Sequence, residues 1–276
     1  MKLSALLLAC AVAGGPVVAA ETEVQAAPGV AALWRTPDSG WDGRAVLLLH
    51  GFADDRDGVG DLAKTLGDAL EARGIASLRI NFRGEGDRNR TRIESTFTTR
   101  LEDAAAATRF LQSLPGVDRA RLGALGFSLG ASTAIVTAGR EPSWFRTLAV
   151  WSSPGGDHFA LYADNPVARR AMADGEATED VPGWKKITTR REFYESFRGV
   201  DVDASLARYP GAFFSVRGTD DFLPQHEVEF LKAARGWPRE AVLVGGADHT
   251  FRVLEPGAVQ PARVIALTVE WFGRTL

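Results

Sequence analysis

Residues 126–130 read Gly-Phe-Ser-Leu-Gly (GFSLG), and this pentapeptide decides how the rest of the chain is interpreted. It joins an apolar run, LGALGF at 122–127, to a segment rich in small residues, LGASTAIV at 129–136. The first is typical of a buried strand and the second of a helix. A serine between glycines at such a junction predicts a sharp turn that projects Ser128 above a sheet, beside the free N–H groups of a helix. Ser128 is therefore a candidate nucleophile, and the alternative is a hydroxyl in a glycine-rich turn.

Strands and helices alternate on both sides of this turn. The segments expected as strands are 30–35 at an edge of the sheet, then 44–51, 75–82, 121–127, 147–152, 212–216 and 241–244. The segments expected as helices are 62–70, 97–114, 129–139, one that follows Pro224 and one that ends near 272. Such alternation requires right-handed crossovers and produces a mostly parallel, doubly wound sheet. A chain of 276 residues is long enough for one large α/β domain of this kind.

The alternation stops at 155–209, where the chain is polar and carries scattered aromatic side chains. A segment of this length is not an ordinary loop. We expect a small helical insertion, a lid, over the carboxyl edge of the sheet, where open α/β sheets bind ligands. Its aromatic residues either form an acyl or aryl pocket or pack the lid onto the sheet.

A serine hydroxyl needs a base, and the chain offers four histidines: His50, His158, His226 and His249. His249 follows the apolar strand AVLVGG in a loop that can return to the edge of the sheet, so it is the candidate base. The candidate acid follows another strand, in GTDDFLP at 218–224, where either Asp220 or Asp221 can serve. The chain order Ser, Asp, His differs from the order in the chymotrypsin and subtilisin types of serine protease.

Together, these motifs resemble the α/β-hydrolase superfamily over nearly the whole chain after residue 20. The matching segments are HGF at 50–52, NFRGEGD at 81–87, GFSLG at 126–130, GTDDFLP at 218–224 and GADHTF at 246–251. Within the superfamily, the chain looks most like feruloyl or cinnamoyl esterases with a small lid and dienelactone-hydrolase-like enzymes. The resemblance implies the α/β-hydrolase fold and a catalytic triad of serine, histidine and aspartate.

The resemblance also implies roles for individual residues. The backbone N–H groups of Phe52 and Leu129 would form an oxyanion hole. The acid usually stands three residues after the glycine that ends its strand, which selects Asp221. The proline that follows is usually four residues after the acid, and this register favours Asp220. We expect Asp221 to be the acid, with Asp220 as the alternative, and no cofactor or metal is implied.

The expected reaction is the hydrolysis of a small carboxylic ester through an acyl-enzyme. Peptidase, thioesterase and cofactor-free peroxidase activities are alternatives, because the fold and the triad do not fix the leaving group. A catalytically inactive binding protein on the same fold is a further alternative. The presence of Ser, Asp and His together argues against that last alternative.

The charge balance and the N-terminus bear on partners and location. With 32 Lys and Arg against 35 Asp and Glu, the formal net charge is −3, so we expect no nucleic-acid partner. Residues 1–20 have a basic start at Lys2, an apolar middle and a small-residue end, which is typical of a signal peptide. We expect a secreted or periplasmic hydrolase domain at 21–276 without stable membrane insertion. A retained N-terminal anchor and a lipidated Cys10, the only cysteine, are the alternatives.

Overall fold

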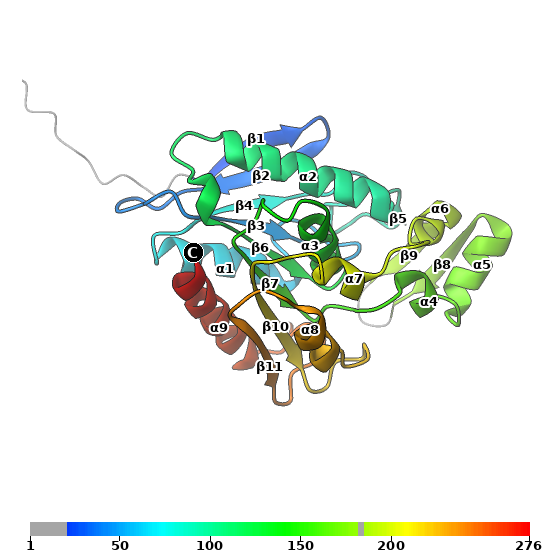
Figure 1. The fold of residues 1–276 in the computed structure, drawn as a ribbon. Helices are drawn as coiled ribbons and strands as arrows, with labels where there is room; N and C mark the ends of the chain where they lie inside the picture. Colours follow the sequence, from blue (N-terminus) through cyan, green and yellow to red (C-terminus); the bar gives the residue numbers. More distant parts are fainter. Residues whose placement is uncertain (1–20, 182–184) are drawn as a thin grey trace, which may run out of the picture.

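The computed structural model describes residues 21–181 and 185–276, and the predicted signal peptide lies outside these residues. Its centre is an eight-stranded sheet in the order β1-β2-β4-β3-β6-β7-β10-β11 (Figure 1). The strands are β1 (Glu21–Ala27), β2 (Val30–Arg35), β3 (Ala45–Leu49), β4 (Ala76–Ile80), β6 (Leu122–Phe127), β7 (Thr147–Trp151), β10 (Ala212–Gly218) and β11 (Arg239–Val244). All neighbours from β4 to β11 are parallel, whereas β2 is antiparallel to both β1 and β4. The predicted mostly parallel sheet is confirmed.

The edge of the sheet differs from the prediction. Segment 30–35 was expected at the edge, but β1 lies outside it and makes β2 the second strand. β1 has the sequence ETEVQAA and is largely exposed, so it lacks the apolar run by which the inner strands were found. An exposed antiparallel edge strand gives little periodic signal in the sequence.

Helices cover both faces of the sheet. The helices that pack on the sheet are α1 (Leu62–Glu71), α2 (Phe97–Ser113), α3 (Leu129–Arg140), α8 (Glu227–Ala233) and α9 (Gln260–Thr275), with short 3-10 turns η1 (Val59–Asp61) and η2 (Arg119–Arg121). Successive residues of β3 point to opposite faces: Leu47 packs with the core under α2 and α3, and Leu48 with the core under α1 and α9. The sheet is therefore buried on both sides, which explains its continuous apolar strands.

The insertion leaves the carboxyl end of β7 and returns before β10 (Figure 1). Its elements are α4 (His158–Leu161), α5 (Pro166–Asp174), β8 (Glu176–Asp180), β9 (Lys186–Arg190), α6 (Arg191–Glu195) and α7 (Val202–Leu206). We expected helices alone, but β8 and β9 pair antiparallel, and β5 (Arg92–Ile93) adds a parallel third strand to them. The β-branched Ile-Thr-Thr of β9 favours a strand over a helix.

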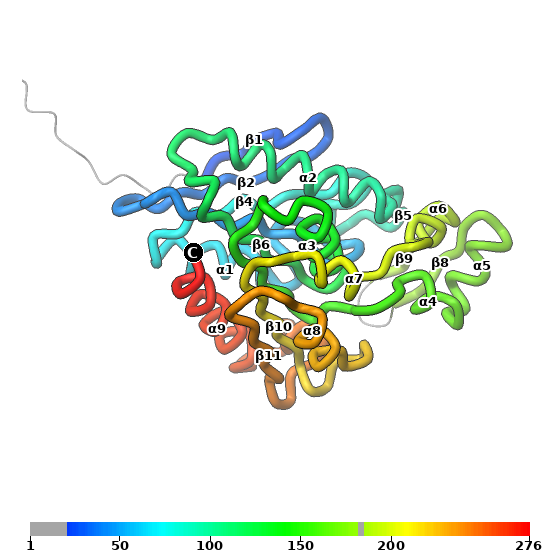
Figure 2. The backbone as a smooth tube through the Cα atoms, in the orientation of Figure 1, coloured from blue at the N-terminus to red at the C-terminus, as the bar shows by residue number. Residues whose placement is uncertain are grey.

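The two ends of the insertion lie side by side where it joins the sheet (Figure 2). Asp157 and Asp201 form an isolated antiparallel bridge, the Val202 N–H donates to Gly156 O, and the His158 N–H donates to Val200 O. These backbone hydrogen bonds tie the two ends of the insertion to each other.

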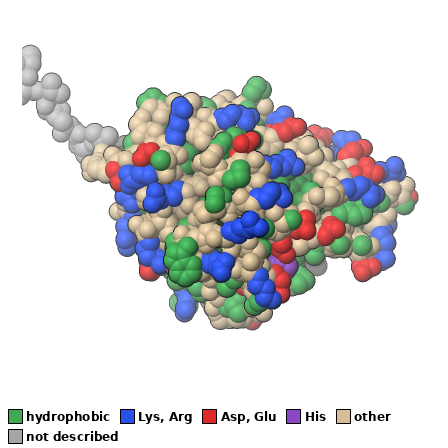
Figure 3. All heavy atoms as spheres, viewed as in Figure 1, with side chains coloured by type: hydrophobic (Ala, Val, Ile, Leu, Met, Phe, Trp, Pro, Cys, Tyr) green, Lys and Arg blue, Asp and Glu red, His purple; other side chains and the backbone are tan. Residues whose placement is uncertain are grey.

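The described part of the chain contains no helix that is long and apolar enough to span a bilayer. Figure 3 shows basic and acidic side chains interspersed over the face in view, including the face of the insertion. This mixture agrees with the near-balanced charge of the sequence.

Candidate active site

Ser128 stands on a sharp turn between β6 and α3. Its backbone has φ 53° and ψ −120°, a conformation that is strained for a residue with a side chain. A Cβ atom on Gly126 would lie 2.2 Å from Gly130 O, and one on Gly130 would lie 2.2 Å from Leu49 O. The turn therefore requires glycine at both positions. The Ser128 N–H is fixed by a 2.8 Å hydrogen bond to Trp151 O at the end of β7.

His249 reaches Ser128 from the loop that follows β11. Its Nε2 lies 2.9 Å from Ser128 Oγ, and its Nδ1 lies 2.8 Å from Asp221 Oδ1. An ionised carboxylate only accepts hydrogen bonds, so Nδ1 carries the proton and Nε2 is left to accept the serine hydroxyl. Phe251, buried beneath this loop, packs edge-on against Trp151 of β7. The imidazole is thus oriented as a base for the Ser128 hydroxyl.

The structure places Asp221, and not Asp220, beside His249. Asp221 Oδ1 also accepts the Leu223 N–H at 2.9 Å, and its Oδ2 accepts Arg217 Nη1 at 3.1 Å. Burial alone would raise the pKa of Asp221, but the hydrogen bond and charge of His249, the Leu223 N–H and the Arg217 charge together lower it. The Asp220 side chain is 51% exposed and pairs with Arg252 at the surface.

Two buried charged residues behind the carboxylate of Asp221, Arg217 and Glu227, were not predicted from the sequence. Arg217 Nε donates to Glu227 Oε1 at 2.8 Å, and its Nη2 donates to Ser153 O at the end of β7. Arg217 thus connects Asp221 to the ends of β7 and β10 and to α8. An arginine inside the buried run AFFSVRG of β10 was the signal that could have revealed it, because a buried guanidinium requires acceptors.

Phe52 and Leu129, the expected oxyanion donors, lie next to Ser128. Leu129 is the first residue of α3, where helix N–H groups have no intrahelical partner. A Cβ atom on Gly51 would lie 3.5 Å from Ser128 Cβ, so the loop containing Phe52 passes beside the serine. Among the described residues, no protein acceptor binds the N–H of Phe52 or Leu129. Both donors are available to a negatively charged oxygen.

The other three histidines are held away from Ser128. His50 is buried, and its Nε2 accepts the Phe82 N–H. His158 is also buried, and its Nε2 lies 2.8 Å from Ser132 Oγ. Burial lowers the pKa of both His50 and His158 to about 4. His226 binds the carboxylate of Asp203, mainly through a hydrogen bond that raises its pKa.

The insertion places aromatic side chains near the site. The Phe193 ring lies 5.0 Å from the Phe52 ring, measured between centroids. A cavity of about 490 Å³ opens within the insertion, and its lining is largely apolar. The larger side chains that line this cavity are Phe159, Tyr162, Arg169, Met172 and Tyr194. The aromatic residues of the insertion therefore both pack against the loop that contains Phe52 and line a cavity.

In the described ranges, no three His, Cys, Asp or Glu side chains converge as metal ligands would.

Comparison with known proteins agrees with this architecture. A family model described as the "Alpha/beta hydrolase family" matches residues 46–267. An uncharacterised protein of Mycobacterium tuberculosis strain H37Rv, Rv2307c, is 29% identical over 227 residues, which is 82% of this chain and 70% of that protein.

Two solved structures are similar in fold. Est1E from Butyrivibrio proteoclasticus with bound ferulic acid has a TM-score of 0.68 at 16% identity, covering 89% of this chain and 95% of that one. The esterase domain of a Rhodothermus marinus protein has a TM-score of 0.65 at 21% identity, covering 94% of this chain and 99% of that one.

Proposed function

The chain belongs to the α/β-hydrolase family, and on that premise we propose that it is a serine hydrolase that cleaves carboxylic esters. The observation that carries the proposal is the hydrogen-bonded series from Ser128 Oγ through His249 to Asp221, at 2.9 and 2.8 Å. Nucleophile, base and orienting carboxylate are within hydrogen-bond reach of one another, as nucleophilic catalysis requires.

In the first half of the reaction, His249 Nε2 takes the proton of Ser128 as Oγ attacks the ester carbonyl carbon. The carbonyl oxygen becomes negatively charged and accepts hydrogen bonds from the Phe52 and Leu129 N–H groups. Asp221 stabilises the imidazolium. The tetrahedral intermediate then collapses, its bond to the alcohol oxygen breaks, and His249 returns its proton to that oxygen. Alcohol leaves and an acyl-Ser128 ester remains.

In the second half, His249 takes a proton from a water molecule, which attacks the acyl carbon. The same two N–H groups hold the second oxyanion. The bond to Ser128 Oγ breaks, Oγ recovers a proton from His249, and the carboxylic acid is released. These steps use only groups of the described chain, water and the ester.

Two further observations support an ester as the substrate. One fold neighbour is an esterase domain and another holds ferulic acid, an aromatic carboxylic acid. The insertion also packs the apolar ring of Phe193 against Phe52, one of the expected oxyanion residues, where it can contact an apolar acyl or aryl group. Peptide and thioester hydrolysis and a peroxidase reaction would use the same triad. If one of these were the main activity, kcat/KM would be higher for amides, for thioesters or for peracid formation, respectively, than for oxygen esters.

Fluorophosphonate labelling and ester hydrolysis test the proposal. The wild-type protein should be labelled at Ser128 and should hydrolyse nitrophenyl or feruloyl esters of graded size. Ser128→Ala should lose labelling and about 10⁴-fold or more of the turnover, because triad members act as a unit. A variant that keeps more than about a tenth of the activity would show that Ser128 is not the nucleophile.

We also propose that the protein is exported. The support is the pattern of residues 1–20, with a basic start, an apolar run and small residues before Glu21. N-terminal sequencing of the protein from its native host should begin at or near Glu21. Soluble cytoplasmic protein with an intact Met1 would contradict export.

A further inference from the structure

A buried ion pair lies outside the triad and has no role in the steps above. Glu85 follows β4 in the NFRGEGD turn, and Arg100 lies in the first turns of α2. Arg100 Nη1 is 2.6 Å from Glu85 Oε1, and both side chains are 0% exposed. Removing two charges from water is costly, and a buried pair is weak evidence for stability by itself. The contacts of the pair therefore decide what it does.

Besides Ser95 Oγ and Thr133 Oγ1, the pair contacts the backbone on either side of Phe52. Arg100 Nη2 donates to His50 O at 2.6 Å, and Glu85 Oε2 accepts the Ala53 N–H at 2.7 Å. The backbone is thus held before and after Phe52, while the Phe52 N–H itself is left without a partner in the described chain.

The carbonyl of Gly51 sets the direction of the Phe52 N–H, because both belong to one peptide group. In a trans peptide the C=O and N–H point in opposite directions. Gly51 O is bound on the buried side, by His50 Nδ1 at 2.7 Å and by Arg100 Nη1 at 3.5 Å. His50 Nε2 accepts the Phe82 N–H, so its proton resides on Nδ1 and is donated to Gly51 O. Holding this carbonyl inward turns the Phe52 N–H outward.

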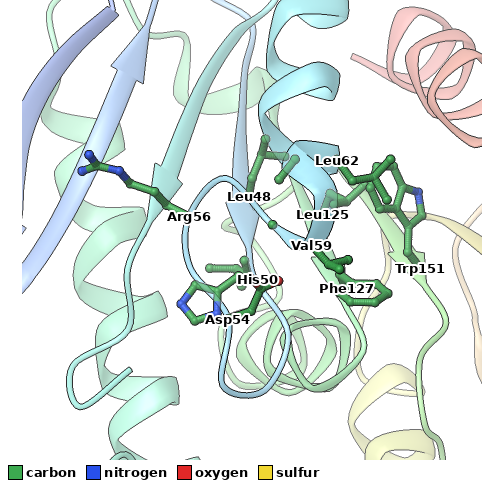
Figure 4. A pocket seen from close by; sticks show the side chains of 12 residues that line it. Leu48, His50, Asp54, Arg56, Val59, Leu62, Leu125, Phe127 and Trp151 are labelled. Atoms are coloured by element: carbon green, nitrogen blue, oxygen red, sulfur yellow. The ribbon is translucent and has the colours of Figure 1, made fainter. Parts of the chain in front are cut away.

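The backbone of Ala53 is in a strained conformation. Its φ is 55°, in the left-handed region that disfavours residues with a side chain. Such strain persists where surrounding contacts hold it. The hydrogen bond from the Ala53 N–H to Glu85 supplies this restraint. Figure 4 shows the course of this loop from the end of β3, with His50 and Asp54 on it.

We propose that Glu85 and Arg100 are positioning residues that aim the Phe52 N–H at the oxyanion. This inference rests on the proposed function. The pair touches neither Ser128 nor His249 in its hydrogen bonds, so it acts through the loop. Its contribution is realised only when negative charge develops on the carbonyl oxygen, so it changes kcat and leaves KM unaffected.

The test replaces both charges together, because removing one would leave the other buried and unpaired. Glu85→Met/Arg100→Met replaces both charged side chains by unbranched apolar ones and removes every hydrogen bond from the pair to the loop, while the His50 hydrogen bond to Gly51 O remains. The matched control is Arg83→Met/Glu102→Gln, which removes a 2.9 Å surface pair that joins the same turn to the same helix. Because Arg83 also pairs with buried Asp103, the control carries Asp103→Asn as well, and none of these three side chains hydrogen-bonds the loop.

We expect the double-methionine variant to lose about 10²–10³-fold in kcat with KM within a few-fold of wild type, the usual effect of losing one oxyanion donor. Its affinity for an alkyl boronic acid, which forms a tetrahedral adduct with the serine, should fall in parallel. The control should keep the wild-type kcat and the wild-type affinity for the boronic acid, with a melting temperature equal to or lower than that of the double-methionine variant. A kcat that falls no further than the control's would overturn the positioning role.

A second variant guards against misfolding of the first. Arg100→Lys keeps the charge beside Glu85, but one ammonium cannot span the carbonyls that the guanidinium fork reaches. We expect about a tenfold loss of kcat at unchanged KM, and wild-type kcat would contradict the proposal. Fluorophosphonate labelling of the wild-type protein separates the two hypotheses. Labelled wild type with unchanged variants overturns the positioning role alone, and unlabelled wild type overturns the proposed function and this inference with it.

Discussion

Asp221 Oδ1 lies 2.8 Å from His249 Nδ1, while the adjacent Asp220 turns to the surface and pairs with Arg252. We therefore expect Asp221→Asn to reduce kcat by up to about 10⁴-fold, because asparagine cannot stabilise the imidazolium and favours the wrong tautomer. Asp220→Asn removes an exposed charge and should stay within a few-fold of wild type. Both variants are measured on one nitrophenyl ester at one pH. An inactive Asp220→Asn variant together with an active Asp221→Asn variant would reverse the assignment.

Arg217 should matter for stability as well as for the placement of Asp221. Arg217→Met leaves the carboxylates of Asp221 and Glu227 buried without their shared cation. We expect a loss of about 3–5 kcal/mol in the free energy of unfolding, measured by urea denaturation. Adding Glu227→Gln should restore part of this loss, since it removes one of the unpaired charges. An Arg217→Met variant as stable as wild type would show that solvent or neighbouring groups compensate.

The fold and the grouping of Ser128, His249 and Asp221 could be predicted from sequence because their signals are local. Continuous apolar strands, the glycines around Ser128 and the loop positions of His249 and Asp221 can each be read within a few residues. The edge strand β1 was missed because it is exposed, and β8 and β9 because short polar strands resemble loops.

The supporting charges are long-range features and were harder to predict. Glu85 stands between two glycines, which is typical of a turn and gives no sign of burial, and its buried partner Arg100 is 15 residues away. Arg100 lies three residues after Phe97 on the apolar side of α2, and a charge on that face was the available signal. Which acid such an arginine meets depends on how the elements pack, and a single sequence does not specify that.

Asp54 predicts a pH dependence of stability. The residue is 8% exposed and lies beside an apolar cavity lined by Val59, Leu62, Phe127 and Trp151 (Figure 4). Burial raises its pKa from 3.8 to about 6. Between these values the folded state holds a proton that the unfolded state has released, so stability falls as pH rises from about 4 to 6.

Asp54→Asn should remove this penalty. At pH 8 we expect the variant to be more stable than wild type by about 1–3 kcal/mol, and near pH 4 the difference should vanish. Thermal unfolding across this range gives the comparison, with Asp38→Asn, the loss of an exposed carboxylate, as the control. A pH-independent difference would mean that Asp54 is not the group responsible.

Phe222 predicts the preference for the leaving group. Its ring is 77% exposed, yet its centroid lies only 4.5 Å from that of the His249 ring. In the proposed mechanism His249 protonates the departing alcohol oxygen, so the alcohol part of the ester would lie on the His249 side and contact Phe222. Covering an exposed aromatic ring with an apolar group contributes about 1–2 kcal/mol.

Phe222→Ala should therefore lower kcat/KM for phenyl and benzyl esters about 5- to 30-fold, mainly through a higher KM. The kcat/KM for methyl esters of the same acid should stay within about twofold of wild type. Phe222→Leu should recover most of the loss, and Trp237→Ala, which removes another exposed aromatic ring, should change neither substrate. An equal loss on methyl and benzyl esters would mean that Phe222 supports His249 and does not bind the alcohol.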